Sequence, residues 1–142
     1  MAKEDDLKRD CPKYPNQELS FVVPICPSVN HMYIQSKSGK KILTKEAKQY
    51  IAIVQQEVRK EMKEQGWKKD NENVWYVMEL YIYMPDRRIR DSHNMFKLLL
   101  DCCEGLLYNN DYFVMVRTQE VELDKDNPRI EVIFYPKEGR RW

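Results

Sequence analysis

The segment from Asp91 to Leu107 constrains the fold most, because its side chains divide into two faces when it is read as a helix. At about 100° per residue, the apolar side chains gather on one side: Leu98, Leu99, Cys102, Cys103 and Leu106. The polar side chains gather on the other side: His93, Asn94, Lys97, Asp101 and Glu104. An amphipathic helix buries its apolar stripe against other elements, so we expect this one to pack on a core. Asp91 can cap its start, and Gly105 can let the chain leave it.

A second helix and several strands are predicted around this segment. Apolar residues at helical spacing predict a long helix that Thr44 caps and Gly66 ends. Stretches rich in β-formers predict strands over residues 19–23, 32–34, 41–43, 74–84, 113–123 and 129–135. The second and third of these flank a turn with Gly39, which is typical of a hairpin. The order of elements indicates an α+β fold, in which both helices pack on one mixed β-sheet.

Length and composition indicate one ordinary globular domain. A chain of 142 residues with 42% hydrophobic and 33% charged residues fits a single domain with its own core. We expect residues 1–17 to be a flexible, charged N-terminus and residues 18–142 to form the domain. No apolar run is long enough to cross a bilayer, and the charged start does not match a secretory signal peptide. We therefore expect a cytoplasmic protein with no membrane partner.

The cysteines do not predict a metal site or a disulfide framework. The chain has four of them: Cys11, Cys26, Cys102 and Cys103. They lack the paired CxxC spacing of a zinc site, and the last two fall on the apolar side of the predicted helix. We expect reduced, mostly buried thiols, because a buried cysteine behaves as a small hydrophobic residue.

The polar side of the segment belongs to a concentration of charge over residues 86–111. Asp91, Asn94, Lys97 and Asp101 recur on nearly one line, and Asp111 follows a short connector. Such a cluster costs free energy unless it binds a metal or performs chemistry. Helix capping would explain Asp91 alone, and an ion pair four residues apart would explain Lys97 with Asp101. Neither explanation covers the whole group.

Basic residues cluster even though the net charge is only +1. One group is Lys37, Lys40, Lys41, Lys45 and Lys48, and the other is Arg87, Arg88 and Arg90. Local patches of this kind can contact phosphates. A solvated helix surface explains a run of Lys equally well, so the first group stays open. The Arg group would place phosphate-binding guanidiniums beside candidate metal ligands.

Two motif blocks occur in order between about residue 20 and residue 135. The first contains Pro27-Ser28-Val29-Asn30, then Tyr33, Gly39 and the segment LTKEAKQY. The second contains, at fixed spacing, Asp91, Asn94, Lys97, Asp101, Gly105 and Asp111. In these blocks the chain resembles the RusA-like Holliday junction resolvases, small endonucleases of bacteria and their prophages. Two positions depart from the pattern of that family: His93 stands where its second Asp would be, and Asn110 stands where the first Asp of its acidic pair would be.

The resemblance implies a metal-dependent, structure-selective endodeoxyribonuclease of DNA recombination and repair, which resolves Holliday junctions by paired nicks. It implies catalytic roles for Asp91, Lys97 and Asp111, and it implies metal binding by Asp91, Asp101 and Asp111. We expect His93 to share both roles, because it lies next to Asp91 at the head of the helix and not on its apolar side. Mg²⁺ would be the cofactor, and Mn²⁺ is an alternative because a histidine nitrogen suits a softer metal than Mg²⁺. A surface histidine without a function remains the other interpretation of His93.

Further roles are expected for other residues in and around these blocks. Asn94 and Asn110 would support the ligands through hydrogen bonds. Contacts to DNA would come from Asn30, Lys40, Lys41, Arg87, Arg88 and Arg90. A turn residue is the alternative interpretation of Asn30 in its proline-rich loop.

The partner that the resemblance implies is branched DNA. A four-way junction has near two-fold symmetry, so a homodimer with two sites is its simplest match. The apolar strand over residues 74–83 is one possible dimer interface, and a place in the buried core is the alternative. A second function also stays open: a junction-binding or branched-DNA-binding protein of the same fold, in which the changes at His93 and Asn110 have weakened or abolished catalysis.

Overall fold

The computed structural model describes residues 18–26, 33–71, 74–88 and 92–137. Its elements are β1 (Leu19–Val23), β2 (Tyr33–Gln35), β3 (Lys41–Leu43), α2 (Lys45–Gln65), β4 (Tyr76–Met84), α3 (Ser92–Cys103), the short 3₁₀ helix η2 (Asp111–Phe113), β5 (Val114–Leu123) and β6 (Arg129–Pro136). Within these residues, a mixed sheet with two α-helices confirms the predicted α+β fold. The predicted flexible N-terminus, residues 1–17, lies outside the described residues.

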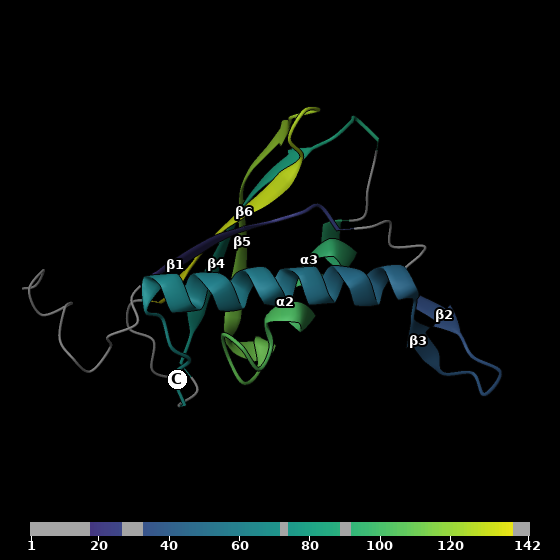
Figure 1. Ribbon diagram of the computed structural model, residues 1–142, viewed down its shortest axis with the longest axis horizontal. Coiled ribbons are helices and arrows are strands. Elements are labelled where there is room, and N and C mark those ends of the chain that lie inside the picture. Colours follow the sequence, from purple (N-terminus) through teal and green to yellow (C-terminus); the bar gives the residue numbers. More distant parts are fainter. Residues whose placement is uncertain (1–17, 27–32, 72–73, 89–91, 138–142) are drawn as a thin grey trace, which may run out of the picture.

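The main sheet has four strands in the order β1-β6-β4-β5 (Figure 1). β6 pairs antiparallel with β1 and with β4, whereas β4 and β5 run parallel. Parallel neighbours need a crossover connection, and α3 with the loop after it forms that crossover. The crossover returns the chain to the sheet at Val114, which pairs with Tyr76 at the start of β4. β2 and β3 form a separate hairpin, which lies at the beginning of α2 (Figure 1).

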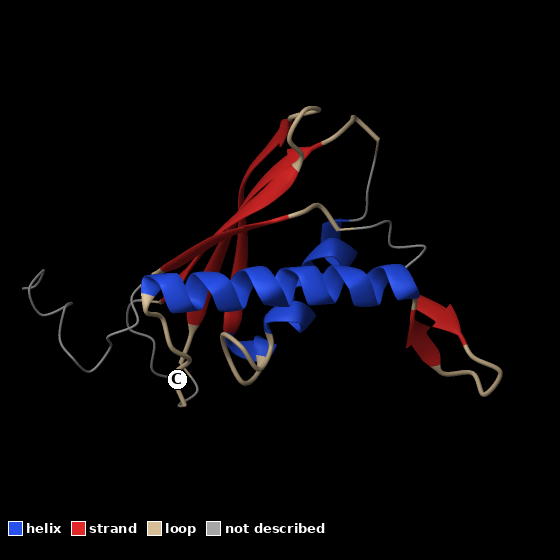
Figure 2. Ribbon diagram, in the orientation of Figure 1, coloured by secondary structure: helices blue, strands red, loops and turns tan. Residues whose placement is uncertain are grey.

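One face of the main sheet and both helices share a single core. Alternate residues of β1 and β6 point into it, including Phe21, Val132 and Phe134. α2 adds Ala47, Tyr50, Val54 and Val58, and α3 adds Met95, Leu98, Leu99, Cys102 and Cys103. Figure 2 shows α2 running across the sheet. Burial of each large apolar side chain contributes roughly 1.5–3 kcal/mol, so the predicted apolar face of α3 is what fixes this helix in place.

β4 lies between β6 and β5, and its alternate residues are buried in the core. Tyr76 stacks on Phe134 with ring centroids 4.6 Å apart, and Trp67 meets the same ring edge-on at 5.8 Å. This agrees with the interpretation of residues 74–83 as a core strand.

The ends of α2 match the sequence prediction. The Thr44 hydroxyl accepts a hydrogen bond from the Ala47 N–H at 3.2 Å, which caps the first turn. Gly66 ends the helix with φ of 68°, a left-handed conformation that glycine adopts without steric cost.

Several predicted strand boundaries differ from the structure: β2 ends at Gln35, β4 begins at Tyr76 and β6 ends at Pro136, where residues 34, 74 and 135 were predicted. The predicted helical segment is helical from Ser92 to Cys103, and the chain leaves it at Gly105 as predicted, with φ of 88° at that glycine. The strand predicted from Phe113 begins at Val114, because the Asn110 side chain accepts a hydrogen bond from the Tyr112 N–H and starts η2. Residue 32 of the predicted hairpin lies outside the described residues.

Three of the four cysteines lie in the described part of the chain, and all three are buried and outside any disulfide: Cys26, Cys102 and Cys103. Burial raises the pKa of Cys26 and of Cys102 to about 12. A thiol with such a pKa stays protonated near neutral pH, so the prediction of reduced, buried thiols is confirmed for these residues. Among the described residues, no helix is long and apolar enough to cross a membrane.

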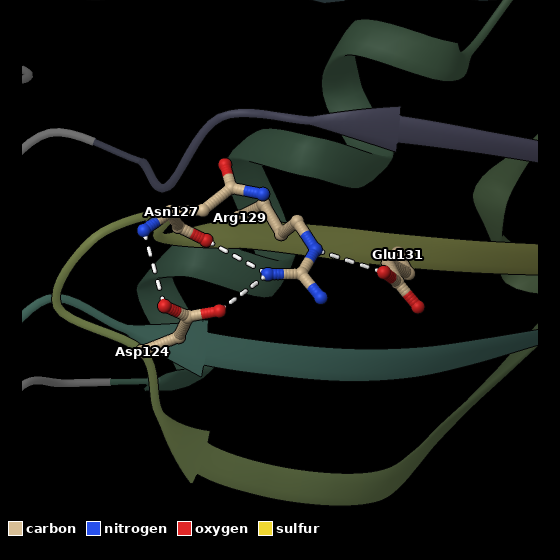
Figure 3. Close-up of polar contacts among 4 residues, drawn as sticks. All are labelled: Asp124, Asn127, Arg129 and Glu131. Atoms are coloured by element: carbon tan, nitrogen blue, oxygen red, sulfur yellow. Dashed lines mark hydrogen bonds and ion pairs between the residues drawn. The ribbon is translucent and has the colours of Figure 1, made fainter.

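The turn between β5 and β6 is held by Arg129 (Figure 3). Its guanidinium donates hydrogen bonds to the carboxylates of Asp124 at 2.9 Å and Glu131 at 2.8 Å. It also donates to the Asn127 carbonyl at 2.8 Å and lies 3.9 Å from the centroid of the Tyr83 ring. The hydrogen bonds from Arg129 lower the pKa of Asp124.

Replacing Arg129 by Gln is expected to lower the midpoint of thermal unfolding at pH 7. A carboxylate whose pKa is lowered by folding stabilises the protein above its unfolded pKa of about 3.9. That contribution is lost as the pH falls through the lower, folded pKa, so the difference between variant and wild type should shrink in acid. Thermal melts between pH 7 and pH 3 measure it, with Lys125→Gln in the same turn as the control. A difference that stays constant with pH would contradict the role of Asp124.

Candidate functional site

The connection between α3 and η2 brings the candidate carboxylates together. After Cys103 the chain turns tightly: the Leu107 N–H donates to the Cys103 carbonyl at 2.9 Å, and the Gly105 N–H donates to the Tyr108 carbonyl at 2.7 Å. This turn brings Asp111 back to the end of α3, where its N–H donates to the Glu104 carboxylate at 3.1 Å. The start of η2 is therefore fixed to the last turn of the helix.

Further contacts fix the same loop to the core. The buried Tyr108 donates its hydroxyl hydrogen to the Leu100 carbonyl at 2.7 Å. The Lys69 ammonium donates to the Asn109 side-chain oxygen, and the Asn109 amide donates to the Asn71 carbonyl at 3.4 Å. These hydrogen bonds hold the loop over residues 104–111 in one conformation, and they therefore fix the position of Asp111, as a preorganised site requires.

Electrostatics show that the acidic side chains act on one another. Partial burial raises the pKa of Asp101, and the negative charges of Asp111 and Glu104 raise this pKa further. The positive charge of Lys97 opposes the rise. The three carboxylates therefore form one negatively charged group beside a lysine, and a bound cation would relieve the repulsion among them.

Lys97 forms no ion pair with the acidic residues that the structure describes. Its side chain is exposed, and among the described residues no carboxylate oxygen lies within 4.0 Å of its ammonium nitrogen. The alternative that Lys97 serves only as an ion-pair partner of Asp101 is therefore not supported. An exposed ammonium beside a group of carboxylates is free to contact a phosphate.

The described carboxylates fit a hard cation in chemistry but do not complete a site for one. Mg²⁺ prefers oxygen ligands, which Asp101, Glu104 and Asp111 offer. Within residues 18–26, 33–71, 74–88 and 92–137, however, no group of three or more His, Cys, Asp or Glu side chains is placed to hold a metal. Further ligands would have to come from Asp91, which lies outside the described residues, and from the His93 side chain.

The structure describes some of the other predicted site residues and not others. His93 and Asn94 belong to the first turn of α3, and their side chains lie outside the described part. Asn30 and Arg90 also lie outside it. Lys40 and Lys41 are exposed on the β2–β3 hairpin, and Arg87 and Arg88 are exposed in the connection after β4.

Arg88 and Asn110 each make a contact within the protein that was not predicted from the sequence. The Asp86 carboxylate accepts the Arg88 N–H at 3.0 Å and pairs with the Arg88 guanidinium at 3.3 Å, so Asp86 orders this connection. The side-chain oxygen of Asn110 accepts the Tyr112 N–H at 2.9 Å. Asn110 was predicted to support the metal ligands through hydrogen bonds. Its side-chain oxygen would have to do so while it also accepts the Tyr112 N–H.

Glu104 was missed as a site residue. Its place on the polar face of the helix is visible in the sequence, together with Lys97 and Asp101. The sequence does not show that the chain would turn back so that Glu104 holds Asp111. Helical periodicity was therefore the one signal that could have included it.

Comparison with known families and proteins gave two results. A family model described as Endodeoxyribonuclease RusA matches residues 23–135. A search of curated individual proteins gave no significant match. The matched region begins at the last residue of β1 and ends within β6, so it includes α3, the loop after it and η2.

Proposed function

We propose that this chain, which belongs to the RusA endodeoxyribonuclease family, resolves Holliday junctions by metal-dependent paired nicks in DNA recombination and repair. Membership of the family implies a junction-resolving endonuclease. The observation that carries the rest of the proposal is the group of Asp101, Glu104 and Asp111 beside the exposed Lys97. Such a group suits the hydrolysis of a phosphodiester, whose transition state gathers negative charge.

Each residue has a separate task in the proposed mechanism. Asp91 and Asp111 would hold Mg²⁺, with Asp101 and His93 as further ligands and with Asn94 in support. When bound, the metal would supply Lewis-acid stabilisation and a more acidic water. Lys97 would place its ammonium against the phosphate oxygens as their charge develops. Glu104 would keep Asp111 in position through the backbone hydrogen bond.

His93 should determine which metal supports activity. Replacing His93 by Asp would supply the hard oxygen ligand that Mg²⁺ prefers. We expect the ratio of the Mg²⁺-supported to the Mn²⁺-supported cleavage rate to rise about tenfold in this variant. Single-turnover cleavage of a labelled junction in each metal gives the ratio. An unchanged ratio would mean that His93 is a surface residue without a role at the metal.

Glu104 should act through Asp111. Replacing Glu104 by Ala removes the acceptor of the Asp111 N–H, and we expect cleavage about 10-fold to 100-fold slower and weaker Mn²⁺ binding. Glu104→Gln keeps an acceptor oxygen and should retain most of both. Cleavage rates and calorimetric Mn²⁺ titration of the two variants test this. Equal losses in Gln and Ala would instead assign Glu104 a role through its charge.

A homodimer would match the two-fold symmetry of a four-way junction and would carry one site for each nicked strand. We also propose that the protein acts in the cytoplasm, in the bacterial or prophage setting that the family implies. Light scattering during size-exclusion chromatography, with and without a junction, tests the dimer. A monomer in both conditions would oppose paired cutting by two sites of one assembly.

A second function is favoured by two observations: His93 replaces an expected carboxylate, and the oxygen of Asn110 is engaged in capping η2. These changes are compatible with a protein that binds branched DNA without cutting it. Incubation of a synthetic four-way junction with the protein in Mg²⁺, and separately in Mn²⁺, separates the two functions. Paired nicks that Asp91→Asn abolishes support the nuclease. Binding without nicks in either metal would support the binding protein, and a lack of salt-sensitive binding would oppose both.

A further inference from the structure

The exposed side of α2 carries positive charge near both ends of the helix. At about 100° per residue, its basic side chains gather on one side of the helix: Lys45, Lys48, Arg59, Lys60 and Lys63. Only uncharged residues lie between them on that side: Gln49, Ala52 and Gln56. All eight side chains are exposed. We call these eight residues the basic face of α2.

The acidic residues of α2 lie to one side of this face, with Glu64 nearest to it, about 40° from Lys60. Glu46, Glu57, Glu61 and Glu64 lie about 100° to 160° around the helix from Lys45 and Lys63. Glu57 and Glu61 line a hollow with Ser20 and Phe21, and Gln65 beside them hydrogen-bonds to the backbone of Ser20, so the acidic side turns toward β1. A helix that is merely solvated usually mixes its charges, and this one separates them.

The charges of the basic face are also unpaired within the described residues. None of its five cations lies within 4.0 Å of a described carboxylate oxygen. Lys60 and Glu64 are four residues apart but form no such pair. Arg59 and Lys63 are also four residues apart, and like charges at this spacing destabilise a helix slightly. A polyanion would offset that cost.

The basic face lies next to the acidic group of the candidate site. Gln55 lies on α2 between the basic face and the buried side of the helix. Its side-chain amide donates a hydrogen bond to the Cys102 carbonyl, near the end of α3, at 3.2 Å. An open hollow of about 390 Å³ is lined by Arg59, Lys63 and Leu106, among others. Leu106 belongs to the turn that joins Glu104 to Asp111. At its other end α2 begins beside the β2–β3 hairpin with the exposed Lys40 and Lys41 (Figure 1).

We infer that the basic face of α2 binds the phosphate backbone of one duplex arm of the DNA whose strand the neighbouring acidic group cuts. The inference rests on the proposed function for the identity of the DNA. Lys45 and Lys63 are 18 residues apart, which is about 27 Å along a helix, or about eight phosphates of one strand at about 3.4 Å each. Contacts from lysine and arginine side chains to phosphates carry no sequence information. The arm is therefore held without sequence preference.

Salt dependence of binding tests the inference with variants matched in charge. Arg59→Gln/Lys63→Gln and Lys45→Gln/Lys48→Gln each remove two charges from the basic face. The control, Arg117→Gln/Lys125→Gln, removes two exposed charges from β5 and the turn after it. Junction binding is measured in EDTA from about 50 to 300 mM salt, since each phosphate contact contributes about 0.9 to the slope of log K against log salt. We expect each basic-face variant to reduce the slope by about 2, equally for junctions of different sequence, and the control to leave it unchanged.

Unchanged slopes in both basic-face variants, or an equal loss in the control, would overturn the inference. Preferential binding of duplex RNA or of an acidic protein through the same residues would overturn it as well. Because no metal is present, the result does not depend on cleavage. A wild-type protein that never cuts, but whose slope falls in the basic-face variants, would refute the proposed nuclease and leave this surface in place.

Discussion

Asp111→Asn is expected to slow junction cleavage by at least about 10³-fold while leaving junction affinity nearly unchanged. The variant loses a carboxylate charge but keeps its shape and its backbone N–H, so the hydrogen bond to Glu104 at the end of α3 should persist. It also removes a negative charge that raises the pKa of Asp101. Without metal, the variant should therefore be at least as stable as the wild type, and loss of activity could not be assigned to unfolding.

Single-turnover cleavage, a gel-shift titration in EDTA and a thermal melt measure these three quantities. Asp126→Asn is a matched control, since it removes an exposed carboxylate from the turn between β5 and β6. Cleavage by Asp111→Asn within about tenfold of the wild type would show that Asp111 does not hold the metal. Loss of both binding and cleavage would show that it acts on the fold.

Lys97→Gln is the second change with a large expected effect, a loss of about 10²-fold to 10³-fold in the rate of the chemical step. Lys97 is exposed, makes no ion pair within 4.0 Å with a described carboxylate, and still acts electrostatically on Asp101. Its ammonium is thus available for a phosphate whose negative charge grows during hydrolysis. The substitution leaves the buried face of α3 unchanged, so stability should be nearly that of the wild type.

The form of the kinetic loss distinguishes transition-state stabilisation from simple DNA binding. A residue that acts on the transition state lowers the maximal rate, whereas a residue that binds substrate and transition state equally weakens affinity alone. Lys97→Arg keeps the charge in a different geometry and should recover part of the rate. A weaker affinity with an unchanged maximal rate would move Lys97 to the DNA-binding residues.

The elements of the fold were predictable because each has a local cause. Thr44 and Gly66 limit α2 through backbone conformations that can be read from the sequence. The apolar side of α3 is buried because its spacing matches a helix, with Leu98 and Cys102 among its buried residues. Neither result needs knowledge of what the helix packs against.

The pairing of the strands was not predictable in the same way. β1 pairs with β6, which is the last strand along the chain, and β5 is parallel to β4. Periodicity along a strand shows which side is buried but does not identify the neighbouring strand. The same limit applies to the site. The motif named Asp101 and Asp111, but the contact that brings Asp111 to Glu104 depends on the left-handed turn at Gly105.

The most direct test of the proposed metal site is a crystal structure of the protein in Mn²⁺, with anomalous scattering recorded at the manganese edge. The account predicts an anomalous peak within about 2.0–2.2 Å of carboxylate oxygens of Asp91 and Asp111, with Asp101 and His93 in reach and Lys97 beside the peak. Glu104 should still accept the Asp111 N–H in that structure. A saturated crystal with no peak at these carboxylates, or with a peak held by other residues, would contradict the account.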